Sequence, residues 1–298
     1  MTARAARKGR IVFACSGGPG NSAAIPWLAA KFGAEIVAMT LDIGQARELE
    51  SVRQAALAAG AARAHVLDVR DEFARDCILG SLRAGAAADD PLAHALARPL
   101  IARKLVEIAR IEEATAIAHG GDDDDHAAIE AAAHAIDPSI SVIPASAAPV
   151  SAHGYIIHRT LWGRSIDCGF REPGDELPEE VYALTAPATR APDAPAHLEI
   201  AFEAGLPVAV NGVPMPLTEL IESVTTIAGN HGVGRVTNAA SRTACEAPAA
   251  VVLQAAHAAL GTAARRAAGA TVRMELFRGR HTIVSTTLQK AGRAAHGS

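Results

Sequence analysis

One stretch of the sequence has the residue types and spacing of a phosphate-binding loop. Residues 15–22 (CSGGPGNS) follow the β-branched run 10–14 and lead into a segment with helical spacing. The first backbone N–H groups of a helix have no intrahelical partner and the helix dipole is positive there, so an anion is stabilised. The loop therefore predicts a phosphate site. The alternative is an ordinary glycine turn with Ser22 as the helix N-cap.

A second stretch that could do chemistry is the run 122–125, four aspartates followed by His126. Carboxylates in the first turn of a helix complement its dipole, so the run favours an acidic start to a helix over 126–136. The alternative is a metal site that uses Asp122 and His126, which lie one helical turn apart. We assign no metal site and keep these two residues as its candidates.

The four cysteines are Cys15, Cys77, Cys168 and Cys245, and they lie far apart in the sequence. Their spacing matches neither a CxxC pair nor a disulfide framework, and it predicts unreactive thiols in a cytoplasmic protein. Cys15 lies beside the predicted anion site, where a helix N-terminus could lower the pKa of its thiol; burial is the alternative.

The composition excludes several classes of protein. The chain has 298 residues, 50% of them hydrophobic and 20% charged, with a formal net charge of -4. This is too apolar for a disordered chain, and the apolar residues form no run long enough to span a membrane. Clustered lysines and arginines typical of nucleic-acid binding are lacking. The basic residues before position 11 are not followed by the apolar region of a signal peptide, which favours a cytoplasmic location.

The elements that must position these residues follow an α/β pattern over residues 1–150. Short apolar runs alternate with stretches whose apolar residues recur every three or four positions, which predicts a doubly wound, mainly parallel sheet. The expected strands are 10–14, 35–41, 63–68, 114–119 and 140–143. The expected helices are 22–32, 46–59, 71–83, 96–110 and 126–136.

Residues 151–298 are expected to form a smaller α+β domain. Prolines are frequent over 144–195 and predict a connection made of loops. Beyond it we expect strands at 197–203, 207–210, 271–277 and 281–287 and helices at 216–229 and 247–260. Asn211-Gly212 predicts a tight hairpin, and 278–280 is expected to join the last two strands.

Six motifs, in order along the chain, point to one family. They are residues 12–22, LDIGQ at 41–45, ALARPLIARKLVEIA at 95–109, LWGRSI at 161–166, IAGNHGVGR at 227–235 and EAPA at 246–249. Together they resemble argininosuccinate synthase. The resemblance implies a nucleotide-binding ATP pyrophosphatase domain and a synthetase domain that together ligate citrulline and aspartate. ATP would adenylate the ureido oxygen of citrulline before aspartate attacks, giving argininosuccinate, AMP and pyrophosphate in arginine biosynthesis.

The resemblance also implies site residues, ligands and assembly. ATP with magnesium is the implied nucleotide, two amino acids are the other small-molecule ligands, and a homo-oligomer is implied although a C-terminal segment of the family is missing. The implied nucleotide-binding residues are Ala14, Ser16, Gly17, Gly18, Ser22, Asp42, Gln45 and Gly120. The implied substrate-binding residues are Asp125 and Ser165. No catalytic residue is assigned.

Several positions that would hold substrates differ from the family. The family loop SGGLDTS is SGGPGNS here, so its carboxylate is replaced by Gly20. A tyrosine and hydroxyl residues of the citrulline segment are replaced by Asp90, His94 and Ala95, and a later tyrosine by Cys245. The glycine-rich TGKGNDQVRFE loop has become the aspartate run 122–125.

These substitutions leave three hypotheses open. The first is an ATP-dependent carbon–nitrogen ligase that is inefficient with citrulline and aspartate or uses a changed acceptor. The second is a catalytically inactive relative that acts as a binding or regulatory protein. The third is a metal-dependent activity at residues 122–126. Poor orientation of reactants alone could remove much of the rate, because proximity supplies about 7–11 kcal/mol in such reactions.

Overall fold

The structure is a computed structural model that describes residues 9–16, 19–45, 48–84, 95–121, 123–145, 156–167, 177–237, 243–266 and 269–289. The chain divides into two compact units. The first unit comprises Met1–Val69 and Ala95–Ser151, and the second comprises Arg70–His94 and Ala152–Ser298. The predicted boundary between residues 150 and 151 stays a prediction.

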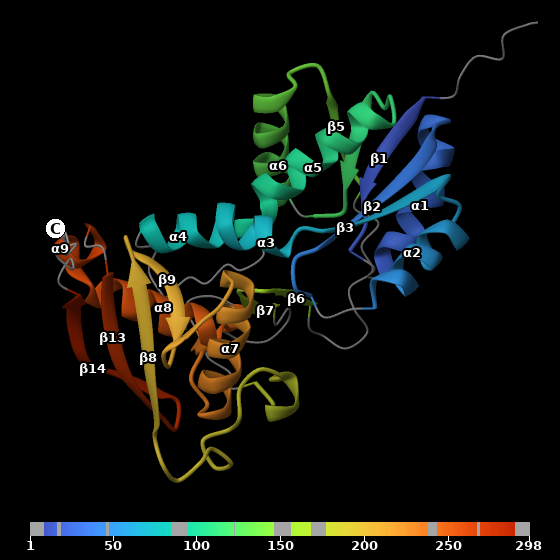
Figure 1. The fold of residues 1–298 in the computed structure, drawn as a ribbon. Coiled ribbons are helices and arrows are strands. Elements are labelled where there is room, and N and C mark those ends of the chain that lie inside the picture. The colour runs from blue at the N-terminus through green and yellow to red at the C-terminus, as the bar shows by residue number, and fades with distance from the viewer. Residues whose placement is uncertain are drawn as a thin grey trace, which may run out of the picture. The chain divides into compact units, whose positions relative to one another are not determined.

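The first unit is built on a five-stranded parallel sheet (Figure 1). Its strands are β1 (Arg10–Ala14), β2 (Glu35–Asp42), β3 (Arg63–Asp68), β4 (Ala116–His119) and β5 (Ser141–Pro144). Their order in the sheet is β3-β2-β1-β4-β5, so the chain builds outward from β1 in one direction and then in the other. This arrangement confirms the predicted doubly wound fold.

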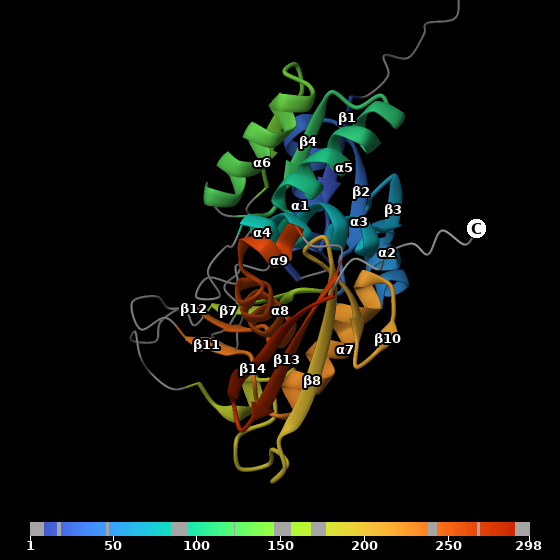
Figure 2. The ribbon, with the colours of Figure 1, turned by 60° about the vertical axis from the view of Figure 1, so that its left-hand side comes forward.

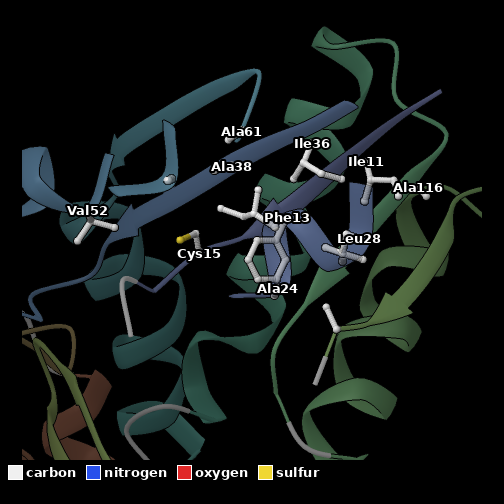
Figure 3. Packing of buried hydrophobic residues seen from close by; sticks show 14 residues of the cluster. Ile11, Phe13, Cys15, Ala24, Leu28, Ile36, Ala38, Val52, Ala61 and Ala116 are labelled. Carbon is white, nitrogen blue, oxygen red and sulfur yellow. The ribbon is translucent and has the colours of Figure 1, made fainter. Parts of the chain in front are cut away.

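Helices cover both faces of this sheet. They are α1 (Pro19–Phe32), α2 (Leu49–Ala58), the 3₁₀ turn η2 (Ala95–Ala97), α5 (Arg98–Ile111) and α6 (Asp123–Ile136). Residues alternate between the faces of a strand, and Ile11 and Phe13 of β1, with Cys15 just after its end, all pack toward α1 and α2 (Figure 3). The other face is covered by α5, which contacts β1, β2 and β4 and packs against α6.

Two helices start three residues before their predicted starts. Helix α1 begins at Pro19, because the fixed φ of proline suits the first helical position and its missing N–H costs nothing there. Ser22 therefore lies inside the helix, and its prediction as the N-cap is wrong. Helix α6 begins at Asp123, so three aspartates form its first turn.

The second unit contains two antiparallel sheets (Figure 2). The five-stranded sheet has the order β10-β9-β8-β13-β14, with β8 (Ala196–Glu203), β9 (Leu206–Val210), β10 (Val213–Pro214), β13 (Gly269–Phe277) and β14 (Arg280–Gln289). The four-stranded sheet has the order β11-β12-β7-β6, with β6 (Ile156–Thr160), β7 (Gly163–Asp167), β11 (Arg235–Thr237) and β12 (Thr243–Glu246). The helical elements are η3 (Glu179–Val181), α7 (Leu217–Asn230), α8 (Pro248–Ala259) and α9 (Gly261–Arg266).

The five-stranded sheet is connected by tight two-residue turns. Asn211 and Gly212 both have positive φ, 49° and 78°, and they join β9 to β10, which confirms the predicted hairpin. Arg278 and Gly279 join β13 to β14 in the same way, as predicted. Positive φ at both turn residues matches the right-handed twist of the flanking strands.

Two predictions for the connecting regions are wrong. Residues 144–195 are not only loops, because β6 and β7 pair there in an antiparallel hairpin. The helix predicted over 71–83 is three consecutive pieces, α3 (Arg70–Glu72), a π-helical run η1 (Phe73–Ile78) and α4 (Leu79–Ala84), and all three belong to the second unit. Its apolar residues face α7 and α8 of that unit, which a helical pattern by itself does not specify.

Candidate functional site

The sheet order of the first unit creates a switch point between β1 and β4. The connection after β1 passes to β2 on one side, and β4 lies on the other side. In doubly wound folds, ligands bind outside the carboxyl ends of the strands where the order reverses. The predicted residues of this unit gather at that edge: Ala14 ends β1 and is followed by Ser16, Asp42 ends β2 and is followed by Gln45, Gly120 follows β4, and Asp125 lies in the first turn of α6.

The loop between β1 and α1 is only partly described. Ser16 is exposed and lies at the switch point. Gly17 and Gly18 lie outside the described residues, as does the side chain of Ser22, whose backbone is in the first turn of α1. Cys15 is 5% exposed and packs in the core, and its N–H donates to the carbonyl of Met39 at 2.8 Å (Figure 3). Its thiol is therefore a buried core group.

Asp42 and Gln45 organise the loop after β2. Asp42 Oδ1 accepts a hydrogen bond from Gly44 N–H at 2.9 Å. Gln45 accepts from Ile43 N–H at 2.8 Å through Oε1, and its Nε2 donates to the carbonyl of Leu41 at 2.6 Å. Gly44 has a φ of 91°, which favours glycine. Both side chains are thus engaged in shaping this loop.

Two histidines connect the end of β4 to α6. His119 is 2% exposed and its Nε2 lies 3.0 Å from His126 Nδ1. The backbone N–H of Gly121 donates to His119 Nδ1 at 3.2 Å. A backbone N–H can only donate, so His119 Nδ1 is an acceptor and the ring proton of neutral His119 is on Nε2. His119 therefore donates to His126.

An ion pair lies beside these histidines. Arg98, the first residue of α5, donates from Nε to Asp125 Oδ1 at 2.5 Å. Both side chains are about one-fifth exposed. A Cβ at position 121 would overlap the Asp125 side chain, so Gly121 is required for this close approach. The predicted substrate residue Asp125 is therefore already neutralised by a cation of the same unit.

The metal candidates gain no support from the geometry. Asp122 lies outside the described residues. His126 Nδ1 lies 3.0 Å from His119 Nε2, so this ring nitrogen is engaged by another histidine. Within the described parts of the chain, no group of three or more histidine, cysteine, aspartate or glutamate side chains could hold a metal ion.

The remaining predicted residue, Ser165, lies in the second unit on β7. It is 2% exposed, and its direct cross-strand neighbours are His158 on β6 and Cys245 on β12. The structure thus places Cys245, which stands where the family has a tyrosine, beside the predicted substrate serine. Asp90 and His94 lie outside the described residues.

The opposite face of this sheet carries a buried carboxylate, Glu246. Its oxygens accept from Arg164 Nη1 at 2.5 Å, from the backbone N–H groups of residues 183–185 at 2.6–3.0 Å, and from Thr185 Oγ1 at 2.7 Å. Burial alone would raise the pKa of Glu246, but these hydrogen bonds outweigh it and hold the pKa below its ordinary value. The group is structural and orients the strand that carries Ser165.

Two residues at the switch point were not singled out from the sequence. Arg98 lies in the ALARP motif and His119 directly precedes Gly120. Both residues lie in or beside segments that resemble the family. The ion pair between Arg98 and Asp125, however, joins residues 27 positions apart and depends on how α5 and α6 pack. A sequence pattern carries no signal for that contact.

Comparison with known proteins gives one consistent result. Residues 10–156 match the family model described as the Arginosuccinate synthase N-terminal HUP domain, and residues 155–266 match the Arginosuccinate synthase C-terminal domain. The chain is 42% identical to the argininosuccinate synthase of Dehalococcoides mccartyi over 283 residues, which cover 84% of this chain and 70% of that protein. It is 38% identical to the argininosuccinate synthase of Streptococcus suis over 282 residues, with the same coverage.

The solved structures add little to this comparison. An NAD+ synthetase from Burkholderia pseudomallei is similar over 37% of this chain and 44% of that chain, at 24% identity and a TM-score of 0.26, too low to carry an argument. No helix among the described residues is long and apolar enough to cross a membrane. The family models and the sequence relatives agree along most of the chain. The chain therefore belongs to the argininosuccinate synthase family.

Proposed function

We propose that the first unit binds ATP at the β1–β4 switch point and that the protein is an ATP-dependent carbon–nitrogen ligase of the argininosuccinate synthase type. The observation that carries the proposal is the loop between β1 and α1, which ends at a helix N-terminus beside the point of strand reversal. The proposal is supported by membership of a family whose named relatives are argininosuccinate synthases.

The proposed reaction has two steps. The ureido oxygen of citrulline attacks the α-phosphorus of ATP, and the bond to the β-phosphate breaks to release pyrophosphate. The amine of aspartate then attacks the activated carbon, loses a proton and displaces AMP. In this proposal Ala14, Ser16, Gly17, Gly18, Ser22, Asp42, Gln45 and Gly120 bind the nucleotide, and Asp125 and Ser165 bind the amino acids. The cytoplasmic location and the homo-oligomer stay predictions.

We expect this reaction to be slow with citrulline and aspartate. Asp125 is engaged by Arg98, so substrate binding there must compete with an existing ion pair. Asp123 and Asp124 add exposed carboxylates at the same edge, and these repel a triphosphate. Ser165 has a cysteine beside it in place of the family's tyrosine.

Magnesium does not require a dedicated protein site in this proposal. The described carboxylates at the switch point do not fit one, because Asp42 accepts from Gly44 and Asp125 pairs with Arg98. Magnesium typically keeps several waters and binds through substrate phosphates. We therefore expect it to arrive bound to ATP, and no step depends on a protein-held ion.

The test is calorimetric titration with ATP and magnesium, followed by an assay of AMP and pyrophosphate with citrulline and aspartate. We expect micromolar binding that is weakened at least tenfold in Ser16→Ala. Ser139→Ala is the matched control, because Ser139 is exposed and precedes β5, at the opposite edge of the sheet. Undetectable ATP binding by the unaltered protein would refute the proposal.

A second candidate is a catalytically inactive relative that retains nucleotide binding as a regulatory signal. The ion pair between Arg98 and Asp125 favours it, because a predicted substrate group is already satisfied without substrate. This candidate predicts ATP binding without AMP release for any amino-acid pair. Formation of AMP that depends on both citrulline and aspartate would rule it out.

A further inference from the structure

The hydrogen bonds at the end of β4 fix the proton of His126. Gly121 N–H donates to His119 Nδ1 at 3.2 Å, so the proton of neutral His119 is on Nε2. That proton faces His126 Nδ1 at 3.0 Å. Nδ1 of His126 is therefore an acceptor, and the proton of neutral His126 is on Nε2. The chain of donors runs from the backbone of residue 121 outward to His126 Nε2–H.

The outer nitrogen of His126 is available for a ligand. His126 is only half-buried, and its one hydrogen bond among the described residues is made by Nδ1. Nε2 is the ring nitrogen that does not face the buried His119. The two rings are stacked at an interplanar angle of 25°, which restricts rotation of His126. The arrangement presents one oriented N–H donor at the switch point.

The charges around His126 determine which kind of hydrogen-bond acceptor a ligand can offer to Nε2–H. Asp123 and Asp124 are exposed carboxylates of the same helical turn, and Asp125 is paired with Arg98. A neutral donor among carboxylates is unsuited to a phosphate or carboxylate, since both would be repelled. It suits an uncharged carbonyl oxygen.

We propose that His126 Nε2–H donates to the uncharged carbonyl-type oxygen of an amino-acid substrate, such as a ureido or carboxamide oxygen, and that His119 is the positioning residue that fixes its tautomer. The identity of the substrate rests on the proposed function, whereas the tautomer rests on the geometry of the free protein. His126 thus determines specificity for the amino-acid substrate that carries this oxygen, and it takes no part in binding the nucleotide.

The first experiment reads the tautomer directly by nitrogen NMR of the full-length protein labelled at histidine. The His126 signals are assigned by their loss in His126→Asn. We expect a protonated Nε2 and a bare Nδ1 in the absence of ligand. His119→Asn keeps an acceptor for Gly121 N–H but removes the donor to His126, so His126 should become a mixture of tautomers. A proton on Nδ1 of His126 in the unaltered protein would overturn the proposal.

The second experiment titrates the same protein with L-citrulline, with L-norleucine as the control that lacks the ureido group. We expect citrulline to shift the Nε2 signal and norleucine to leave it unchanged. His126→Asn should weaken citrulline binding about tenfold, the loss expected for one hydrogen bond, whereas His126→Gln keeps an outer N–H and should weaken it about twofold.

The outcomes separate this inference from the proposed function. If citrulline binds and leaves Nε2 unshifted, or if both variants bind it as well as the unaltered protein, the inference fails while ATP binding and AMP formation are unaffected. If ATP does not bind but citrulline shifts Nε2, the ligase proposal fails and the inference stands. Citrulline that shifts nothing and binds nowhere also refutes the inference.

Discussion

Glu246 shows at the scale of a single residue how a buried charge is stabilised in this protein. The side chain is fully buried and accepts hydrogen bonds from Arg164, from Thr185 and from the backbone of residues 183–185. Glutamine has only one acceptor oxygen and would turn an N–H₂ group toward donors. It would also leave the guanidinium of Arg164, itself 9% exposed, without its counter-ion.

We therefore expect Glu246→Gln to lower the free energy of unfolding by about 3–5 kcal/mol, measured by urea denaturation. Glu179→Gln is the control, because Glu179 is half-exposed in its ion pair with Arg235 and such pairs contribute about 0–1 kcal/mol. Equal losses in the two variants would contradict this account of Glu246.

At the same scale, the site shows what a sequence can and cannot predict. The positions of Asp42 and Gln45 at the carboxyl edge of the parallel sheet follow from their place at the end of a strand and just after it. Their hydrogen bonds to their own loop follow from the φ of Gly44, which the sequence does not fix. The histidine pair appears only because α6 starts at Asp123 and turns His126 toward β4.

At the scale of elements, two helical glycines have opposite roles. A Cβ at Gly229 in α7 would overlap the carbonyl oxygen of Leu184, and the carbonyl of Gly229 accepts from Ala186 N–H at 2.8 Å. Gly80 in α4 is exposed and has open space around its Cβ position. The first glycine allows a close approach between segments, whereas the second only weakens its helix.

Gly229→Ala should therefore destabilise the protein by about 1–3 kcal/mol or more, because the segment at 184–186 must move. Gly80→Ala should stabilise it by about 0.5–1 kcal/mol, the difference in helix propensity. Thermal unfolding of the two variants beside the unaltered protein checks both signs. Destabilisation by Gly80→Ala would show that α4 has a neighbour at that position.

The turn between β8 and β9 carries backbone strain. Ala204 has a φ of 48° and is followed by Gly205 at 79°, the same conformation as Asn211-Gly212. Alanine is disfavoured in the left-handed region by about 1–2 kcal/mol, and asparagine is tolerated there. Ala204→Asn should thus raise the melting temperature by about 2–4 °C, the shift expected for 1 kcal/mol.

The reverse substitution tests the same explanation. Asn211→Ala should destabilise by more than Ala204→Asn stabilises, because Asn211 Oδ1 also accepts from Glu199 N–H at 2.8 Å. A melting temperature unchanged by both substitutions would mean that the turns relax freely.

The elements also explain which parts of the fold could be predicted. The three inner strands, β1, β2 and β4, are largely continuous apolar runs that are buried along most of their length, and the sequence indicated all five parallel strands. Strands β6, β7, β11 and β12 were missed. Strand β7 begins at Gly163 with a φ of 144° and buries Arg164 and Ser165. Its polar residues are buried because Arg164 pairs with Glu246, 82 positions away, and no local pattern reports such a partner.

At the scale of the whole molecule, buried titratable groups in both units should make stability fall on acidification. Burial lowers the pKa of His257 below 6.5, and the charges of Arg265 and Arg83 add to the effect. Burial alone would raise the pKa of Glu112, but hydrogen bonds from His65 and Arg63 hold it below 4.5. The pKa of Glu246 is likewise held below 4.5 by its hydrogen bonds.

The sign of each contribution follows from which state binds the proton first. Below about pH 6.5 the unfolded chain protonates His257 before the folded chain does, so stability falls. The two carboxylates contribute fully above about pH 4.5, and their contribution is lost as the pH falls through their folded values. Urea unfolding from pH 8 to pH 3.5 should show both stages. His257→Gln should reduce the upper stage and leave the lower stage unchanged, because burial also lowers the pKa of His281, which contributes to the same upper stage. An upper stage of undiminished size would contradict the assignment.

The path of the chain between the units limits how the protein can be divided. After β3, residues 70–94 belong to the second unit. The chain then returns to the first unit and supplies α5, β4 and β5. In that excursion Phe73, Ile78 and Leu82 are buried among elements of the second unit. A fragment cut at residue 150 would keep this apolar helical segment and lose α7 and α8, which pack against it. It should therefore aggregate when expressed alone, even though its own sheet is complete.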